Sequence, residues 1–392
     1  NSYNGNARPF ESTPADGRKA SSMATEAPPS PSLMTGEKPA ASMASRKRQD
    51  SIAGLTFVAP AVLVLLLFMI IPLGFAFVIS LTNWDGITPL SRGAITEENP
   101  NGAYQFVGLE NYQRLLIQEG TRQRNFYTSL KNTIYYVLGV VPVQTAAALG
   151  LAVILNQKWL KRKGFYRTAY YFPSITSSVV ISLIFMWMFT TSGLINQFIG
   201  AIFPNYTYVN WLNNPNGLIH LLLGVFGITR RTVGDWASIQ ITSMTLWDWI
   251  SGPSVTMFMI MMLNVWTTIG TMMIIYLAAL QSIPGQVYEA AIVDGANGWQ
   301  IFRKITVPLL RGTTFFVVTI GLIGSFQVFD QVFVITNGGP ANTTLTIAYL
   351  VYSSAFTDAR MGLASATAIV LFIIIFIFTI VQRRLVGERA KM

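Results

Sequence analysis

The sequence predicts an all-α, polytopic membrane protein with six transmembrane helices, and three observations support this prediction. Of the 392 residues, 52% are hydrophobic and only 11% are charged, about half the charged fraction of an ordinary soluble domain. The apolar residues are gathered in six long blocks rather than spread along the chain. The basic residues lie largely in the connections between these blocks, where they would orient the chain in a membrane.

Each apolar block is long enough to cross the hydrocarbon core of a bilayer, which requires about 20 helical residues. Six such runs with almost no charged side chains argue against buried helices of a soluble protein. Proline inside a block is compatible with a membrane helix, because neighbouring helices can satisfy the freed carbonyl groups. The predicted spans are 52–81, 132–155, 169–189, 255–280, 313–335 and 361–381.

The composition of the chain changes along its length and predicts three regions. Residues 1–50 are rich in Ser, Pro, Ala, Gly and Thr and poor in bulky apolar residues, so they cannot offset the entropy of ordering. We therefore predict a disordered cytoplasmic tail over 1–50. The first transmembrane helix and an outer loop should occupy 51–125, and the transmembrane core should occupy 126–386.

The distribution of Lys and Arg predicts that both termini are cytoplasmic. With six spans, the basic residues at 46–48, in 156–168, in 281–312 and after 382 all lie on one side, and the other connections hold fewer for their length. Basic connections face the cytoplasm in membrane proteins. The formal charge of +10 is thus interpreted as an orientation signal, and we expect contact with membrane lipid and no nucleic-acid partner.

The outer connection 190–254 is unusually long and contains the only histidine, His220. Its apolar stretch 217–228 is too short to span a bilayer. We predict an interfacial helix or a packed external hairpin, for which Trp236, Trp247 and Trp249 are suitable residues. His220 is interpreted as a surface or interface residue, and a pH switch is the less favoured alternative.

Several classes of function are disfavoured by what the sequence lacks. Without cysteine and with one histidine, a metal site built on thiolates or several histidines is excluded. A membrane enzyme is disfavoured because there is no carboxylate cluster. No phosphate-binding loop motif occurs, so the chain should not bind ATP itself. An ion-coupled secondary carrier would need pairs of broken helices and ligands for the coupling ion, which the sequence does not indicate.

The connection between the fourth and fifth spans predicts a cytoplasmic helix–turn–helix. Pro284 is suited to a helix N-terminus and Gly295 to a helix stop. A second short helix should begin near Trp299 and lead to Pro308. Small side chains at Ala290, Ala291 and Ala296 would leave a shallow surface for another protein.

The same connection resembles the EAA loop of ABC importer permeases through Glu289-Ala290-Ala291, Asp294-Gly295-Ala296 and Ile305-x-x-Pro308. One departure is Val307, where the family usually has leucine. The resemblance implies the type I ABC importer permease fold, with a coupling loop at 283–308 that docks into a cleft of a separate ATPase subunit. The residues implied in this coupling are Glu289, Ala290, Ala291, Asp294, Gly295 and Ala296.

A second resemblance covers 325–340, 352–356 and 361–366, which are similar to carbohydrate-importing permeases of the maltose and glycerol-phosphate type, in particular their larger or first permease subunit. It implies a sugar importer that works by alternating access in a bacterial or archaeal inner membrane. The implied partners are a second permease subunit, an external sugar-binding protein, and two ATPase subunits that hold ATP and Mg. The alternative is an ABC permease for glycerol phosphate, a polyol or an osmolyte. A phosphorylated solute is disfavoured because the third to sixth blocks contain no Lys or Arg.

The fourth span carries candidate solute-pathway residues. Thr267, Thr268 and Thr271 fall on one helix face because they are spaced by three and four residues. Hydroxyl groups bind sugars by hydrogen bonds, and the indole of Trp266 could pack on a pyranose ring. Helix packing through small polar residues is the alternative. By resemblance, these four residues together with Gly324, Ser325 and Val328 match positions that line the sugar site of the maltose permease, but smaller side chains replace its bulky lining, which argues against maltose.

Two polar residues of the fifth span complete the predicted pathway. Gln327 lies beside the positions above, and Asp330 is the only acid inside a predicted span. Intramembrane acids are commonly functional, so Asp330 could face the pathway or its outer gate. The alternative is a structural hydrogen bond to a neighbouring helix or to the backbone of 336–338.

Overall fold

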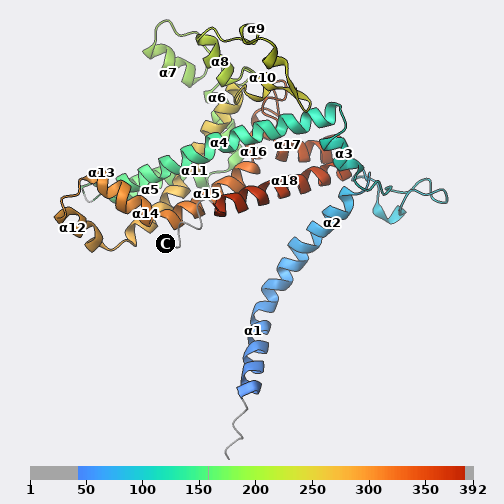
Figure 1. The fold of residues 1–392 in the computed structure, drawn as a ribbon, viewed down its shortest axis with the longest axis horizontal. Helices are drawn as coiled ribbons and strands as arrows, with labels where there is room; N and C mark the ends of the chain where they lie inside the picture. The colour runs from blue at the N-terminus through green and yellow to red at the C-terminus, as the bar shows by residue number, and fades with distance from the viewer. Residues whose placement is uncertain (1–42, 158, 385–392) are drawn as a thin grey trace, which may run out of the picture. The chain divides into compact units, whose positions relative to one another are not determined.

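The structure, a computed structural model, describes residues 43–157 and 159–384 (Figure 1). Residues up to Val64 and residues from Leu65 onward form two separate units. Among the described residues, five segments are long and apolar enough to cross a membrane, and a bent helix pair would make a sixth span. The predicted all-α membrane fold is therefore confirmed, and the predicted six spans are obtained if the bent pair counts as one span.

The first span covers 51–80 and contains two helices joined by a π-helical turn. Helix α1 (Met43–Leu65) is followed by the turn Leu66–Ile70 and by α2 (Ile71–Ser80), which has Pro72 in its first turn. Helix α1 thus begins within the segment 1–50 that the sequence analysis assigned to a tail. The remainder of that predicted tail lies outside the described residues.

The core of the second unit is built on the longest helix, α4 (Thr121–Asn156). Helix α11 (Val255–Gln281) packs against α4, and α15 (Arg311–Phe326) packs against α4 as well. Helix α18 (Met361–Gln382) packs against α2 and against α17 (Ile347–Tyr352) (Figure 1). Helix α3 (Glu110–Leu116) contacts both α4 and α18.

The third apolar block is not the continuous helix predicted over 169–189. Helix α5 (Lys163–Ile175) and helix α6 (Ser178–Met188) meet at an angle of 98°. The hydroxyl groups of Ser174 and Thr176 donate to the carbonyls of Tyr171 and Phe172, at 2.7 and 3.0 Å. Such side-chain bonds to the backbone favour bends, and Pro173 removes a further backbone donor at the same place.

The fifth block is also interrupted, although more mildly. Helix α15 ends at Phe326 and a short α16 (Asp330–Ile335) follows, so that the span covers 311–335. The next segment contains a cis peptide bond between Gly339 and Pro340 and leads into α17. A π-helical turn, Ser353–Thr357, follows α17.

The long connection 190–254 contains short helices and one small hairpin. Helix α8 (Leu218–Val225) lies in the apolar stretch, and β1 (Gln240–Ile241) pairs antiparallel with β2 (Met244–Thr245), with Gln240 opposite Thr245. The connection also contains α7 (Leu194–Ile202), α9 (Arg230–Val233) and α10 (Leu246–Trp249).

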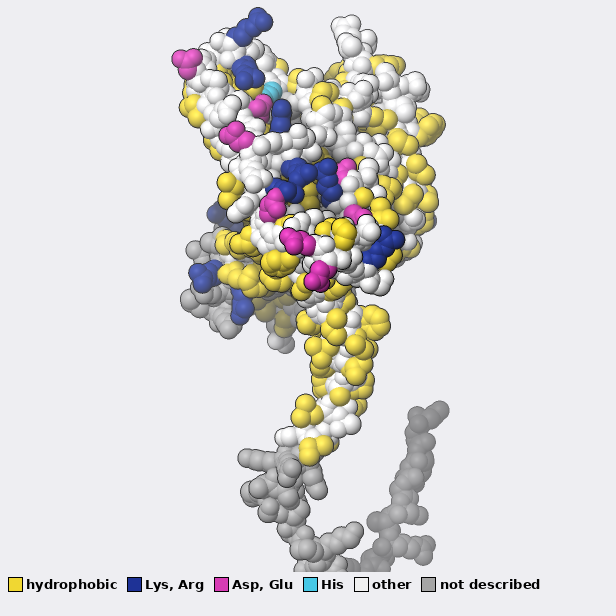
Figure 2. Space-filling model, turned by 90° about the vertical axis from the view of Figure 1, so that its right-hand side faces the viewer, with side chains coloured by type: hydrophobic (Ala, Val, Ile, Leu, Met, Phe, Trp, Pro, Cys, Tyr) yellow, Lys and Arg dark blue, Asp and Glu magenta, His cyan; other side chains and the backbone are white. Residues whose placement is uncertain are grey.

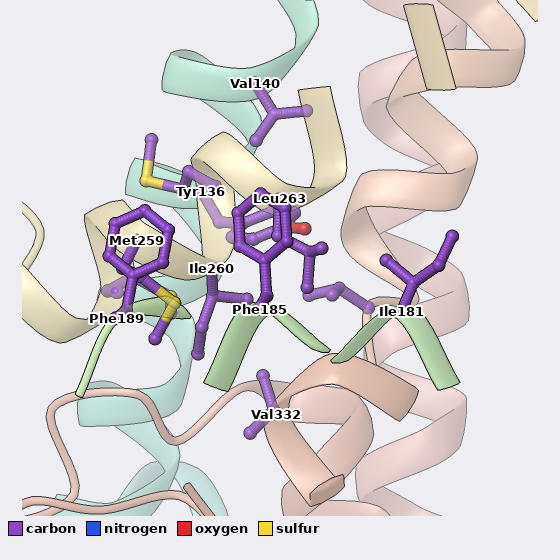
Figure 3. Close-up of a cluster of buried hydrophobic side chains, with 12 residues drawn as sticks. Tyr136, Val140, Ile181, Phe185, Phe189, Met259, Ile260, Leu263 and Val332 are labelled. Atoms are coloured by element: carbon purple, nitrogen blue, oxygen red, sulfur yellow. The ribbon is translucent and has the colours of Figure 1, made fainter. Parts of the chain in front are cut away.

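The central apolar cluster joins helices that are far apart in the sequence. Figure 3 shows Tyr136 and Val140 of α4 beside Phe185 of α6, Leu263 of α11 and Val332 of α16. These side chains are almost completely buried. Because the same helices also carry the polar groups described next, this cluster fixes the geometry of the candidate site.

Candidate functional site

The predicted helix–turn–helix between the fourth and fifth spans is present. Helix α12 (Gly285–Val293) is followed by α13 (Gly298–Ile301), a π-helical turn Phe302–Thr306, and α14 (Val307–Leu309). The turn between the two helices is closed by a hydrogen bond from the Ala296 amide to the Ala291 carbonyl, at 2.9 Å. Gly295 adopts φ +77° there, a conformation that glycine adopts without steric cost.

The surface of this loop is more apolar than its motif suggested. Ala291 is buried and Tyr288 reaches Thr306, with 3.4 Å between the two hydroxyl oxygens, so one side of α12 is held against the protein. Val293 and Ile292 of the same helix are exposed, at 87% and 63%. Large apolar side chains on a loop outside the spans indicate a protein interface. The predicted coupling residues Glu289, Ala290, Asp294 and Gly295 are exposed beside them, and Ala296 is half-buried.

A second candidate site lies where the α5–α6 bend meets α11, and we call it the hydroxyl pocket. Its volume is about 260 Å³. It brings together the three predicted threonines Thr267, Thr268 and Thr271. The remaining lining residues are Pro173, Ser174, Thr176, Ser178, Ile181, Ser182, Leu263, Met272 and Gln331.

The threonine hydroxyls of the hydroxyl pocket are held by the protein. Thr268 Oγ1 lies 2.7 Å from Gln144 Oε1 on α4 and 2.8 Å from the Asn264 carbonyl oxygen. Thr267 Oγ1 donates to the same carbonyl at 3.0 Å. These bonds orient the oxygen atoms on the α11 side of the pocket.

Two serine hydroxyls on the α6 side of the pocket have no such partner. Ser178 and Ser182 are one helical turn apart, and both Oγ atoms are buried without a hydrogen bond to any described residue. The Ser182 side chain is fully buried. An unpaired buried hydroxyl costs about 1–3 kcal/mol, and both residues belong to the lining of the hydroxyl pocket.

The other predicted pathway residues do not line the hydroxyl pocket. Trp266 is half-exposed, and its ring lies 5.5 Å from that of Phe185. Ser325 and Val328 are buried, whereas Gly324 and Gln327 are exposed. Asp330 is exposed at the first position of α16. Its neighbour Gln331 does line the pocket.

A larger cavity of about 610 Å³ lies between α4, α8, α10 and residues 341–343, and we call it the charged pocket. Lys131 of α4 donates from Nζ to the Asp248 carbonyl and to Ser251 Oγ, both at 3.3 Å. His220 stacks on Trp247 with 4.3 Å between ring centroids. Burial lowers the pKa of His220 below its ordinary value, so its ring is neutral at pH 7. Figure 2 shows the histidine in cyan among basic and acidic side chains.

No group of three or more His, Asp or Glu side chains within 43–157 and 159–384 is arranged to hold a metal ion. The polar groups of the hydroxyl pocket are instead neutral hydroxyls and amides. Such groups bind and orient a hydroxyl-bearing solute by hydrogen bonds. A bundle of apolar spans with a neutral polar pocket is the architecture of a membrane transport component.

Comparison with known proteins identifies the family. The family model described as "Binding-protein-dependent transport system inner membrane component" matches residues 144–389, and the chain belongs to this family. It is 32% identical to the probable ABC transporter permease protein YesP of Bacillus subtilis, over 89% of this chain and 95% of that protein. The predicted identity as an ABC importer permease is thus confirmed.

Relatives with named substrates include two sugar permeases. The chain is 32% identical to the arabinooligosaccharides transport system permease protein AraP of Halalkalibacterium halodurans, over 73% of this chain and 77% of that protein. It is 29% identical to the lactose transport system permease protein LacF of Rhizobium radiobacter, over 89% of this chain and 98% of that protein. The fold matches that of a bacterial ABC transporter involved in alginate import, with a TM-score of 0.62, 18% identity, and coverage of 88% of this chain and 98% of that one.

Proposed function

We propose that this permease carries sugars and that the hydroxyl pocket is where the solute binds during translocation. The observation that carries the proposal is the pocket itself, which joins the threonine face of α11 to the unpaired serine hydroxyls of α6. Its lining contains no Lys, Arg, Asp or Glu. The names of the relatives AraP and LacF support a sugar as the solute.

The size of the hydroxyl pocket favours a small solute or one sugar unit of a longer chain. Its volume of about 260 Å³ lies just below the range of about 300–1,000 Å³ that is typical of ligand sites. A polyol fits the same lining and is the second candidate. Glycerol phosphate fits poorly because the pocket offers no cation to a phosphate group. Strong phosphate binding uses charge-assisted hydrogen bonds from such cations.

The partners follow from the permease family and from the apolar surface of α12. We propose that Ile292 and Val293, together with Glu289 and Gly295, dock into an ATPase subunit, and that two such subunits hold ATP and Mg. The chain itself then hydrolyses nothing. A second permease subunit and an external sugar-binding protein complete the importer, and both termini of this chain face the cytoplasm, as the basic connections indicate.

The test is uptake of radiolabelled solutes by vesicles that contain the whole complex, with the binding protein saturating. The panel consists of lactose, arabinotriose, maltose, sorbitol, glycerol 3-phosphate and glycine betaine. Thr268→Val and Thr271→Val should each raise KM about fivefold, the effect of losing one hydrogen bond. Thr379→Val on α18, whose hydroxyl bonds to the Ile375 carbonyl, is the control and should leave KM unchanged.

Transport rates are normalised to the amount of assembled complex, which separates solute binding from folding. If the triple variant Thr267→Val, Thr268→Val, Thr271→Val transports the same solutes at the same rate and KM, the hydroxyl pocket is not the solute site. If glycerol 3-phosphate or glycine betaine is the solute taken up, the sugar assignment is wrong.

A further inference from the structure

We propose that Gln144 is a positioning residue for the Thr268 hydroxyl of the hydroxyl pocket, and this inference rests on the function proposed above. Gln144 lies on α4, outside the lining of the pocket, and its side chain is 1% exposed. It reaches the pocket only through Thr268, whose Oγ1 lies 2.7 Å from Gln144 Oε1. Its sequence separation from Thr268 is 124 residues, so the contact depends on how α4 packs on α11.

Counting donors shows which hydrogen bonds the Thr268 hydroxyl can still form with a solute. A threonine hydroxyl has one proton and two lone pairs. The two acceptors near Thr268 Oγ1 are Gln144 Oε1 and the Asn264 carbonyl, and both belong to the protein. The proton of Thr268 is therefore used inside the protein, and the oxygen presents only lone pairs to a solute.

Three other hydroxyls of the lining are in the same state. Thr267 on α11 donates to the Asn264 carbonyl, and Ser174 and Thr176 at the α5–α6 bend donate to carbonyls of α5. These hydroxyl oxygens consequently accept hydrogen bonds. A solute must offer hydroxyl donors to them, which a sugar or polyol does and which a group with acceptors only, such as an ether or a betaine carboxylate, does not.

Gln144 is held tightly on the side away from Thr268. A Cβ atom placed on Gly321 of α15 would lie 2.3 Å from Gln144 Nε2, so the backbone of α15 passes directly against the amide. The side chain is therefore confined between α4, α11 and α15, and the absence of a side chain at position 321 makes room for it. A buried amide fixed in this way can orient a hydroxyl group without touching the solute.

A matched pair elsewhere in the protein provides a control. Gln382 of α18 bonds to Thr319 of α15, with Nε2 to Oγ1 at 3.0 Å and Oγ1 to Oε1 at 3.2 Å. Gln382 is also buried, and its pair likewise joins two helices by a glutamine and a threonine. Neither residue lines the hydroxyl pocket. The two pairs therefore differ in that only the Gln144–Thr268 pair includes a residue that lines the hydroxyl pocket.

The experiment is a double-mutant cycle on uptake by the whole complex in vesicles. Gln144→Met keeps the approximate length of the side chain and removes its polar atoms. The probes are the members of the solute panel above that the wild type transports. We expect Gln144→Met to raise KM about fivefold with kcat retained, and to add little in the Thr268→Val background, because residues that act through one another are not additive.

The control cycle uses Gln382→Met and Thr319→Val, which should change the amount of assembled complex and leave KM unchanged. The inference is overturned if Gln144→Met leaves KM unchanged, if its effect adds fully to that of Thr268→Val, or if Gln382→Met raises KM equally. The proposed function fails separately if Thr268→Val and Thr271→Val leave KM unchanged or if the wild type transports none of the panel. A fall in assembly alone lowers the maximal transport rate and leaves KM unchanged, so transport rates are normalised to the complex that forms.

Discussion

The coupling loop and the hydroxyl pocket are built in opposite ways. The loop 283–308 is closed by short-range bonds, such as those between Asn297 and Gln300 at 2.9 Å, and most of its motif residues are exposed. The pocket depends on contacts between α5, α6, α11 and α16, supported from α4 by Gln144. A substitution in the loop should therefore affect partner binding alone, whereas one in the pocket can affect folding and solute binding together.

The largest expected effect is at Gly270, where α11 approaches α5 beside the pocket. A Cβ atom there would lie 2.1 Å from the Tyr170 carbonyl oxygen, so Gly270→Ala must separate two backbones. Overpacking of this kind costs about 1–3 kcal/mol, and we expect a clearly lower midpoint of thermal unfolding for the purified complex. Gly324→Ala on α15 meets nothing within 4 Å and serves as the control. Equal midpoints for the two variants would show that the helices separate easily.

Gly295→Val tests the loop side of the comparison. Gly295 has φ +77° and no atom within 4 Å of an added Cβ, so the substitution causes backbone strain without a clash. The left-handed conformation costs an L-residue about 1–2 kcal/mol, and a β-branched residue tolerates it worst. We expect about tenfold weaker association with the ATPase, measured by co-purification at several ATPase concentrations.

The amount of Gly295→Val permease in the membrane should stay normal, since the strain is confined to an exposed turn. Gly298→Val, at a position without positive φ and without a neighbour within 4 Å, controls for the added side chain. Loss of the permease from the membrane in the Gly295 variant alone would contradict the local character assigned to the loop.

Substitution of Ser178 and Ser182 tests whether side chains of the pocket can affect solute binding without affecting stability. Their hydroxyls have no described partner, so Ser178→Ala and Ser182→Ala should leave the unfolding midpoint unchanged or slightly raised. Each should raise KM for the transported solute about fivefold if the hydroxyl binds it. Ser129→Ala on α4, whose buried hydroxyl bonds to the Phe126 carbonyl at 2.7 Å, should instead lower the midpoint and leave KM unchanged. The reverse pattern would identify the serines as structural.

The contrast between the locally closed loop and the pocket built from several helices explains which features could be predicted from the sequence. The loop was predicted almost completely, because Pro284 and Gly295 act on residues beside them in the chain. Thr267, Thr268 and Thr271 were found because their shared face follows from helical spacing. The bend between α5 and α6 was missed because hydropathy reports composition and not the path of the backbone, although Pro173 beside Ser174 and Thr176 was a usable signal.

The pocket could not be assembled from the sequence because its partners lie on different helices. Gln144 is a polar residue within an apolar block, which marks it as unusual but does not reveal Thr268 as its partner. Trp266 precedes Thr268 by two residues, which turn a helix by about 200°. It therefore packs toward Phe185 rather than into the pocket.

The smallest expected effect concerns a long-range contact that lies outside the candidate spans, between His220 and Trp247. Burial lowers the pKa of His220 below 6.5, so the unfolded segment binds more protons than the folded one as the pH falls through that range. The contact between α8 and α10 is therefore fully stable above about pH 6.5 and weakens below it. We expect slightly faster amide hydrogen exchange of α8 at pH 5.5, after correction for the intrinsic rate. His220→Phe preserves an aromatic ring without titration and should show no such change. If the wild type and His220→Phe respond equally to pH, the charge of His220 does not govern the contact between α8 and α10.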